Sequence, residues 1–109
     1  MIIVRTILNS LPEKQKEVMQ TLVSMAEPPA NRNGLLSYGI YCDIDDSNVF
    51  NLISEWKSRA YLNLHLRSDT FSVLLGIKGL LSKPIEFHII KVASVEGFAA
   101  VEAARSEHG

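Results

Sequence analysis

The chain has 109 residues, 47% of them hydrophobic, which is enough for one compact core and too short for a second domain of ordinary size. Its 11 Lys and Arg against 12 Asp and Glu give a net charge of -1, which argues against nucleic-acid and anionic-membrane partners, and no stretch reaches the roughly 18 apolar residues of a membrane span. Cys42 is the single cysteine, which excludes an internal disulfide and agrees with a reducing compartment, so we expect a cytoplasmic protein.

The N-terminal part of the chain predicts a strand followed by a helix. Residues 2–9 are rich in β-branched and aliphatic side chains, which indicates a largely buried strand. Apolar side chains then recur at helical intervals over residues 12–25, after Ser10 and Glu13, which have the spacing of a capping box. Residues 28–34 contain two prolines and a glycine, so a loop is expected there.

A hairpin is expected next. Residues 36–42 and 49–56 both alternate as strands do, and a polar segment joins them. This segment holds Asp43, Asp45 and Asp46, but it lacks the Gly and Glu positions of a calcium loop. We therefore expect a solvated turn and no metal site.

The rest of the chain predicts two helical segments, a strand and a tail. A short helix at residues 59–66 follows Ser58, which suits an N-cap. Residues 68–83 form a helical pattern that two glycines interrupt, and residues 85–95 are expected to form the fourth strand. Residues 97–109 are predicted to be a C-terminal helical tail of this single domain.

The element order β-α-β-β-α-β is that of a ferredoxin-like α+β fold, with a four-stranded antiparallel sheet and its helices on one face. Strand one carries aliphatic residues in both of its alternating sets, with Ile2, Val4 and Leu8 on one side and Ile3 and Ile7 on the other. Both faces of the sheet therefore require burial. A second copy of the chain is the simplest cover, so we expect a homodimer in which two sheets close as an α+β barrel.

The segment from Ile53 to Phe71 resembles the antibiotic biosynthesis monooxygenase family. The matching residues are Glu55, Trp56, Ser58, Leu62, His65 and Phe71. The resemblance extends to the glycine-led second strand and to the helix after strand one. It implies a dimeric α+β barrel with a cleft between helices and sheet in each subunit. It also implies an activity among those of the family, which includes cofactor-free oxygenases of quinols and polyketide anthrones and haem-degrading enzymes.

Five residues are candidates for the site in this cleft. His65 would accept a phenolic or enolic proton as a general base, or it is a packed core histidine. Trp56, Tyr61 and Phe71 would form a flat apolar wall against an aromatic substrate, although the Trp56 ring at a strand end is commonly a core anchor. Thr6 would orient a substrate oxygen through its hydroxyl, or it is β-branched strand filler.

Other polar and aromatic residues are given structural roles. Glu55 alternates with Trp56, so it should face the other side of the sheet and form a salt bridge there. Tyr38 and Tyr41 fall on opposite strand faces, so at most one lines the cleft. His88 and Glu86 share a face of strand four, but two ligands without a third do not define a metal site.

The function expected from these residues is that of a cofactor-independent monooxygenase. A small aromatic quinol or polyketide-like substrate would lose a proton to His65, and its anion would react directly with dioxygen, without flavin or metal. Haem degradation is disfavoured because Leu75 stands where the resemblance places the axial histidine. Two alternatives remain, a proton-transfer isomerase that uses the same cleft and a non-catalytic dimeric protein that binds a small metabolite.

Overall fold

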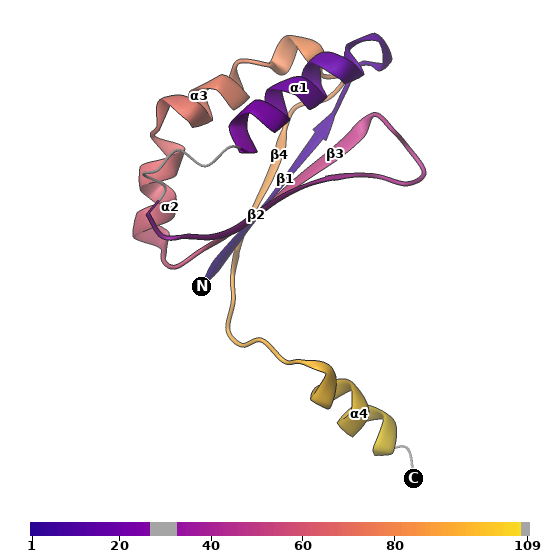
Figure 1. Cartoon of the computed structure of the whole chain (residues 1–109), viewed down its shortest axis with the longest axis vertical. Coiled ribbons are helices and arrows are strands. Elements are labelled where there is room, and N and C mark those ends of the chain that lie inside the picture. Colours follow the sequence, from indigo (N-terminus) through magenta and orange to yellow (C-terminus); the bar gives the residue numbers. More distant parts are fainter. Residues whose placement is uncertain (27–32, 108–109) are drawn as a thin grey trace.

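The computed structural model describes residues 1–26 and 33–107, and it forms a four-stranded antiparallel sheet with strand order β2-β3-β1-β4 (Figure 1). The elements are β1 (Ile2–Asn9), the 3-10 turn η1 (Pro12–Lys14), α1 (Gln15–Ala26), β2 (Leu35–Cys42), β3 (Val49–Trp56), α2 (Arg59–Leu66), α3 (Asp69–Leu75), the 3-10 turn η2 (Lys78–Leu80), β4 (Glu86–Lys91) and α4 (Phe98–Ser106). This confirms the predicted α+β fold. Within the described residues, no helix combines the length and the apolar character needed to cross a membrane.

Several boundaries of helices and strands agree with those predicted from the sequence. β1, β3 and α2 have the predicted bounds, and Ser58 caps α2 by accepting a hydrogen bond from the backbone N–H of Tyr61. Gly34 adopts a φ of 80°, as a turn glycine can, while the rest of the predicted loop, apart from Asn33, lies outside the described residues. In the hairpin turn, Asp43 Oδ1 accepts from the backbone N–H groups of Asp45 and Asp46, which is the expected solvated turn.

Two sequence predictions are wrong at element ends. Ser10 does not cap a helix, because it remains extended, bridges Leu81 and donates its hydroxyl to the Leu11 carbonyl. The fourth strand ends at Lys91 and not at residue 95. Lys91 pairs with Ile2 at the start of β1, and the ladder ends one residue later, where the Val92 N–H donates to the Met1 carbonyl at 3.1 Å.

The core lies between the sheet and α1, α2 and α3, which cover one face of it (Figure 1). Alternate residues of β1 and β3 point into this layer. The larger cluster consists of Leu8, Val18, Leu22, Met25, Phe50, Leu52, Leu74, Ile77 and Leu81. A smaller cluster at the other end of the sheet consists of Ile2, Val4, Trp56 and Leu62. The two clusters flank the space in which the candidate site residues lie.

Within residues 1–26 and 33–107, no helix covers the opposite face of the sheet (Figure 1). Strand pairing places Ile3, Ile7, Ile53 and Ile90 on this open face, together with polar residues. Glu55 also faces this side, as predicted, but it makes no ion pair with any described residue, so an intrachain salt bridge is not found there. The open face therefore carries isoleucines among polar residues, and Ile3 and Ile7 lie on it as the alternation in strand one predicts.

The C-terminal helix α4 stands clear of the rest of the molecule (Figure 1). Its apolar side chains Phe98 and Val101 are exposed, and so is Val95 in the preceding segment. Gly97 at its N-terminus provides no side-chain cap. Residues 98–106 thus form a helix within the predicted tail, and this helix stands apart from the rest of its own subunit.

Candidate active site

Four aromatic side chains from four elements form a continuous series, which we call the aromatic column. The rings of Trp56, at the end of β3, and His65, in the last turn of α2, are stacked with centroids 4.8 Å apart and 30° between planes. Phe71 of α3 meets His65 edge-on at 5.6 Å, and Phe87 of β4 lies 5.6 Å beyond Phe71. His65 is therefore held between two aromatic neighbours.

The polypeptide fixes the middle of this column through the junction of α2 and α3. Ser68 donates its hydroxyl to the His65 carbonyl at 2.6 Å and accepts a hydrogen bond from the Phe71 backbone N–H at 3.2 Å. One serine therefore ends α2, caps α3 and sets the distance between the two rings. The sequence indicates this role, because Ser68 stands at the break between the two helical patterns.

His65 lines a small cavity of about 20 Å³ between the sheet and the helices. Thr6, Tyr38, Ser54 and Phe71 also line it, and apolar side chains from β1, β3, α1, α2 and α3 complete the wall. Thr6 is only 4% exposed and Tyr38 is half-buried. The structure thus brings Thr6, His65 and Phe71 together as predicted. Tyr38 is the tyrosine of the pair that faces this side, because Tyr41 is exposed on the open face.

Trp56 and Ser54 form the support behind His65. Trp56 is 1% exposed, does not line the cavity, and donates its indole N–H to Ser54 Oγ at 2.9 Å. The ring is therefore a core anchor that contacts His65, and not an open wall for a ligand. Ser54 was not among the predicted site residues. Its position two residues before Trp56 on the same strand face is the sequence signal that indicates it.

Tyr61 is the predicted site residue that the structure places elsewhere. It lies one turn before His65 in α2, is 37% exposed, and is absent from the cavity lining. Its ring lies against Gly34 at the start of β2, where any side chain would collide with it. Tyr61 and His65 have i, i+4 spacing in α2, but of the two only His65 lines the cavity.

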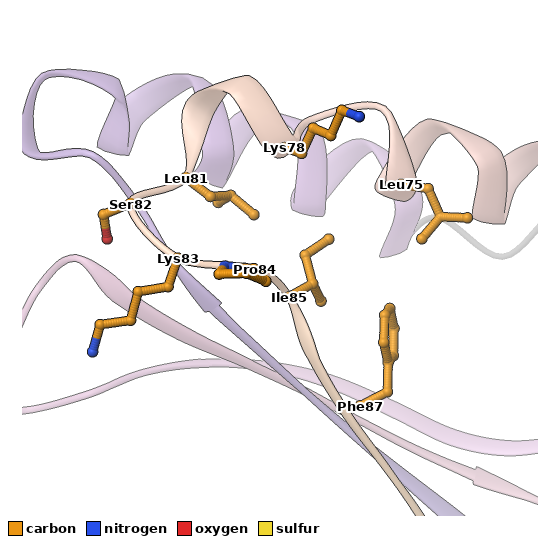
Figure 2. Close-up of a pocket in the computed structure, with 8 residues that line it drawn as sticks. All are labelled: Leu75, Lys78, Leu81, Ser82, Lys83, Pro84, Ile85 and Phe87. Carbon is orange, nitrogen blue, oxygen red and sulfur yellow. The ribbon is translucent and has the colours of Figure 1, made fainter.

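A larger groove of about 520 Å³ runs between the α3–η2 segment and the start of β4 (Figure 2). Its lining residues are Leu75, Lys78, Leu81, Ser82, Lys83, Pro84, Ile85 and Phe87. Figure 2 shows Leu81, Ile85, Leu75 and Phe87 bordering the space, with Lys78 on the helical side and Lys83 at one end. The sequence did not indicate this groove. Its lining residues lie at the end of α3, in η2 and in the segment before β4, and they follow no single helical or strand period along the sequence.

Metal-binding side chains do not gather at either place. In the part of the chain that the structure describes, no group of three or more His, Cys, Asp or Glu residues is arranged to hold a metal ion. His88 and Glu86 contact each other at 3.9 Å on the open face, away from the cavity. Leu75 occupies the position at which the haem-degrading members of the family are expected to carry the axial histidine. It is 48% exposed and lines the groove.

Comparison with known proteins agrees with this architecture. A solved structure of an antibiotic biosynthesis monooxygenase superposes with a TM-score of 0.78 at 21% identity, covering 86% of this chain and all of the other. A conserved protein from Methanosarcina mazei Go1 gives a TM-score of 0.76 at 28% identity, covering 83% of this chain and 90% of that one. At 21% identity, the likeness to the first of these structures establishes the fold alone.

Sequence comparison adds a family and a relative. The chain is 24% identical over 87 residues to "Putative monooxygenase YcnE" of Bacillus subtilis (strain 168), covering 79% of this chain and 92% of that protein. The family model described as antibiotic biosynthesis monooxygenase matches residues 1–74, which include β1 to β3, α2 and most of α3. The chain therefore belongs to the antibiotic biosynthesis monooxygenase family.

Proposed function

We propose that this protein is a cofactor-independent monooxygenase of a small aromatic quinol or polyketide-like substrate, with His65 as the general base. The observation that carries the proposal is the position of His65, which lines a cavity between helices and sheet and is held between Trp56 and Phe71. Family membership supports an oxygenase reaction, and the name of the Bacillus relative describes a monooxygenase.

The chemistry of imidazole suits the first step. An imidazole ordinarily changes charge near pH 6.5, so its neutral form can accept a phenolic or enolic proton at neutral pH. The imidazolium that results is positively charged, and the stacked face of Trp56 at 4.8 Å stabilises a cation through its ring quadrupole. The aromatic column therefore holds the base in place and favours its protonated product.

The substrate anion is then the reductant of dioxygen. For an anthrone, deprotonation of the ring CH₂ gives an anion that transfers one electron to O₂, and recombination of the two radicals forms a C–O bond and a peroxide. The peroxide loses the remaining C–H proton and cleaves its O–O bond. One oxygen atom becomes the new carbonyl, and the other leaves as water with the two hydrogens, including the proton that His65 returns.

The surroundings of His65 favour this chemistry. Apolar side chains form most of the wall, so a substrate anion there has few water molecules around it. Thr6 and Tyr38 add hydroxyl groups that can orient a substrate oxygen. A volume of about 20 Å³ holds a water-sized molecule, so an aromatic ring enters only when a neighbouring side chain moves.

The proposed working unit is a homodimer formed through the open face of the sheet. Ile53, at the centre of this face, pairs with Arg5 on one side and Gly39 on the other. When the open face packs against the open face of a second subunit, its isoleucine side chains are removed from water, which stabilises the dimer. The cleft with His65 lies on the opposite, helix-covered face, so each subunit retains its own site.

The test is oxygen consumption by the purified protein with anthrone, dithranol and substituted hydroquinones. We expect uptake above autoxidation in wild type, and a loss of about a hundred- to ten-thousand-fold in rate in both His65→Ala and His65→Gln. His65→Gln keeps much of the volume and polarity but cannot act as a base at neutral pH. Full activity in folded His65→Gln would contradict the role of His65. Absence of uptake with every compound would favour an isomerase or a binding protein.

A further inference from the structure

The cavity beside His65 and the groove along β4 are separated by two phenyl rings. Phe71 lines the cavity and Phe87 lines the groove, and their centroids are 5.6 Å apart. The cavity holds only a water-sized molecule, whereas the groove has the volume of a site for a small organic ligand. The rings therefore stand between the space that a substrate fits and the group proposed to act on it.

We propose that the groove is the binding site for a planar aromatic anion and that Phe87 is the gate through which its ring reaches His65. This inference rests on the proposed function of His65 and adds to it a substrate class and an entry route. It assigns Lys78 and Lys83 to recognition of the anionic group, and Phe87 to control of access.

The position of Phe87 suits a gate. It lies on β4, an edge strand of the sheet, and is 37% exposed. It pairs across the strands with Thr6, which lines the cavity, so displacement of its ring opens the wall next to Thr6. Phe71, in contrast, is half-buried and packs against the larger core cluster, and Ser68 fixes its backbone. Displacement of the Phe87 ring therefore costs less free energy than displacement of the Phe71 ring.

The lining of the groove indicates the charge of the ligand. Among the described residues that line it, the charged side chains are Lys78 and Lys83, which are both positive, and none is acidic. The remaining lining is mostly aliphatic and aromatic, which suits the faces of a flat ring system (Figure 2). Lysine side chains are long and rotate freely, so they reach an anionic group at different points of the mouth. An aromatic carboxylate combines the two required features.

The first experiment compares 1-naphthoate with the neutral 1-naphthamide by isothermal titration calorimetry. We expect naphthoate to bind more tightly at low salt, and Lys78→Ala/Lys83→Ala to remove this preference, with roughly a fivefold or greater loss of naphthoate affinity. Naphthamide binding should be unaffected by the double substitution. Equal binding of the two compounds to wild type, or no binding of either, would overturn the assignment of the groove.

The second experiment measures access to His65 by modification with diethyl pyrocarbonate, followed site by site with mass spectrometry. N-acetylhistidine added to the same solution serves as the reference, because His88 lies on the open face proposed as the dimer interface. We expect Phe87→Ala to accelerate modification of His65 relative to N-acetylhistidine severalfold, and saturating naphthoate to slow it in wild type. The matched control is Val73→Ala, which shortens an exposed apolar side chain of α3 that lines neither the cavity nor the groove. An unchanged rate in Phe87→Ala would exclude the gate.

These results are separable from the proposed function. If naphthoate binds through the lysines and protects His65, but hydroxylated naphthoates and anthrones cause no oxygen uptake, the groove and gate are supported and the oxygenase is not. If oxygen uptake depends on His65 but not on Lys78, Lys83 or Phe87, the oxygenase is supported and the groove is excluded as its entrance.

Discussion

The hydrogen bond from the Trp56 indole to Ser54 Oγ is buried, and Ser54→Ala removes its acceptor. Trp56 is 1% exposed and Ser54 8%, so the indole N–H is shielded from bulk water when the serine oxygen is removed. An unsatisfied buried donor costs about 1–3 kcal/mol, and we therefore expect a loss of about 2 kcal/mol in the free energy of unfolding. For a domain of this size, that corresponds to a fall of roughly 8–16 °C in melting temperature.

Urea unfolding at a fixed protein concentration measures this loss directly, provided the transition is two-state. The control is the same substitution in a Trp56→Phe background, where no indole donor remains to be satisfied. We expect the cost of Ser54→Ala to fall to under about 1 kcal/mol there, and the difference gives the coupling between the two residues. A loss under about 0.5 kcal/mol in the wild-type background would refute the structural role assigned to this hydrogen bond.

Three further predictions concern the open face, the tail and the stacking of His65 on Trp56. Ile53→Asp places a carboxylate at the centre of the open face, so light scattering at micromolar concentration should show a dimer for wild type and a monomer for the variant; a wild-type monomer would contradict the proposed interface. Removal of residues 96–109 from that monomeric variant should leave its melting temperature unchanged, because α4 stands clear of its own subunit, whereas a loss of several degrees would show intrachain packing. His65→Gln should change the emission of Trp56, the only tryptophan of the sequence, because it removes the imidazole ring stacked on the indole with centroids 4.8 Å apart; an unchanged spectrum would contradict this stacking.

The sequence predicted those parts of the fold that depend on local chemistry. Ser58 indicated the start of α2, and the period-2 pattern of β3 placed Trp56 on the helix-covered face. The end of β4 was predicted wrongly, because the composition of residues 92–95 permits a strand but β1 begins at Ile2, and the pairing ends with the hydrogen bond from the Val92 N–H to the Met1 carbonyl. Strand length there is set by the neighbouring strand and not by the residues themselves.

Some residues of the candidate site could be predicted from the sequence, and others depend on contacts between distant elements. His65 and Phe71 are six residues apart across a helix break, so their proximity follows from the short connection through Ser68. Thr6 comes to them because β1 is a central strand of the sheet. The position of Tyr61 depends on its contact with Gly34, just before β2, and the groove depends on how the α3–η2 segment and β4 lie against each other. Neither of these two contacts can be predicted from the spacing of residues along one element.

The central claim is that an aromatic substrate deprotonated by His65 reacts directly with dioxygen. The most direct measurement is mass spectrometry of the product formed from anthrone under ¹⁸O₂, with wild type and His65→Gln compared under the same conditions. We predict one ¹⁸O atom in the new carbonyl group of the wild-type product and the autoxidation background alone with His65→Gln. Substrate turnover without ¹⁸O in the product, or labelled product formed equally fast by His65→Gln, would contradict the account.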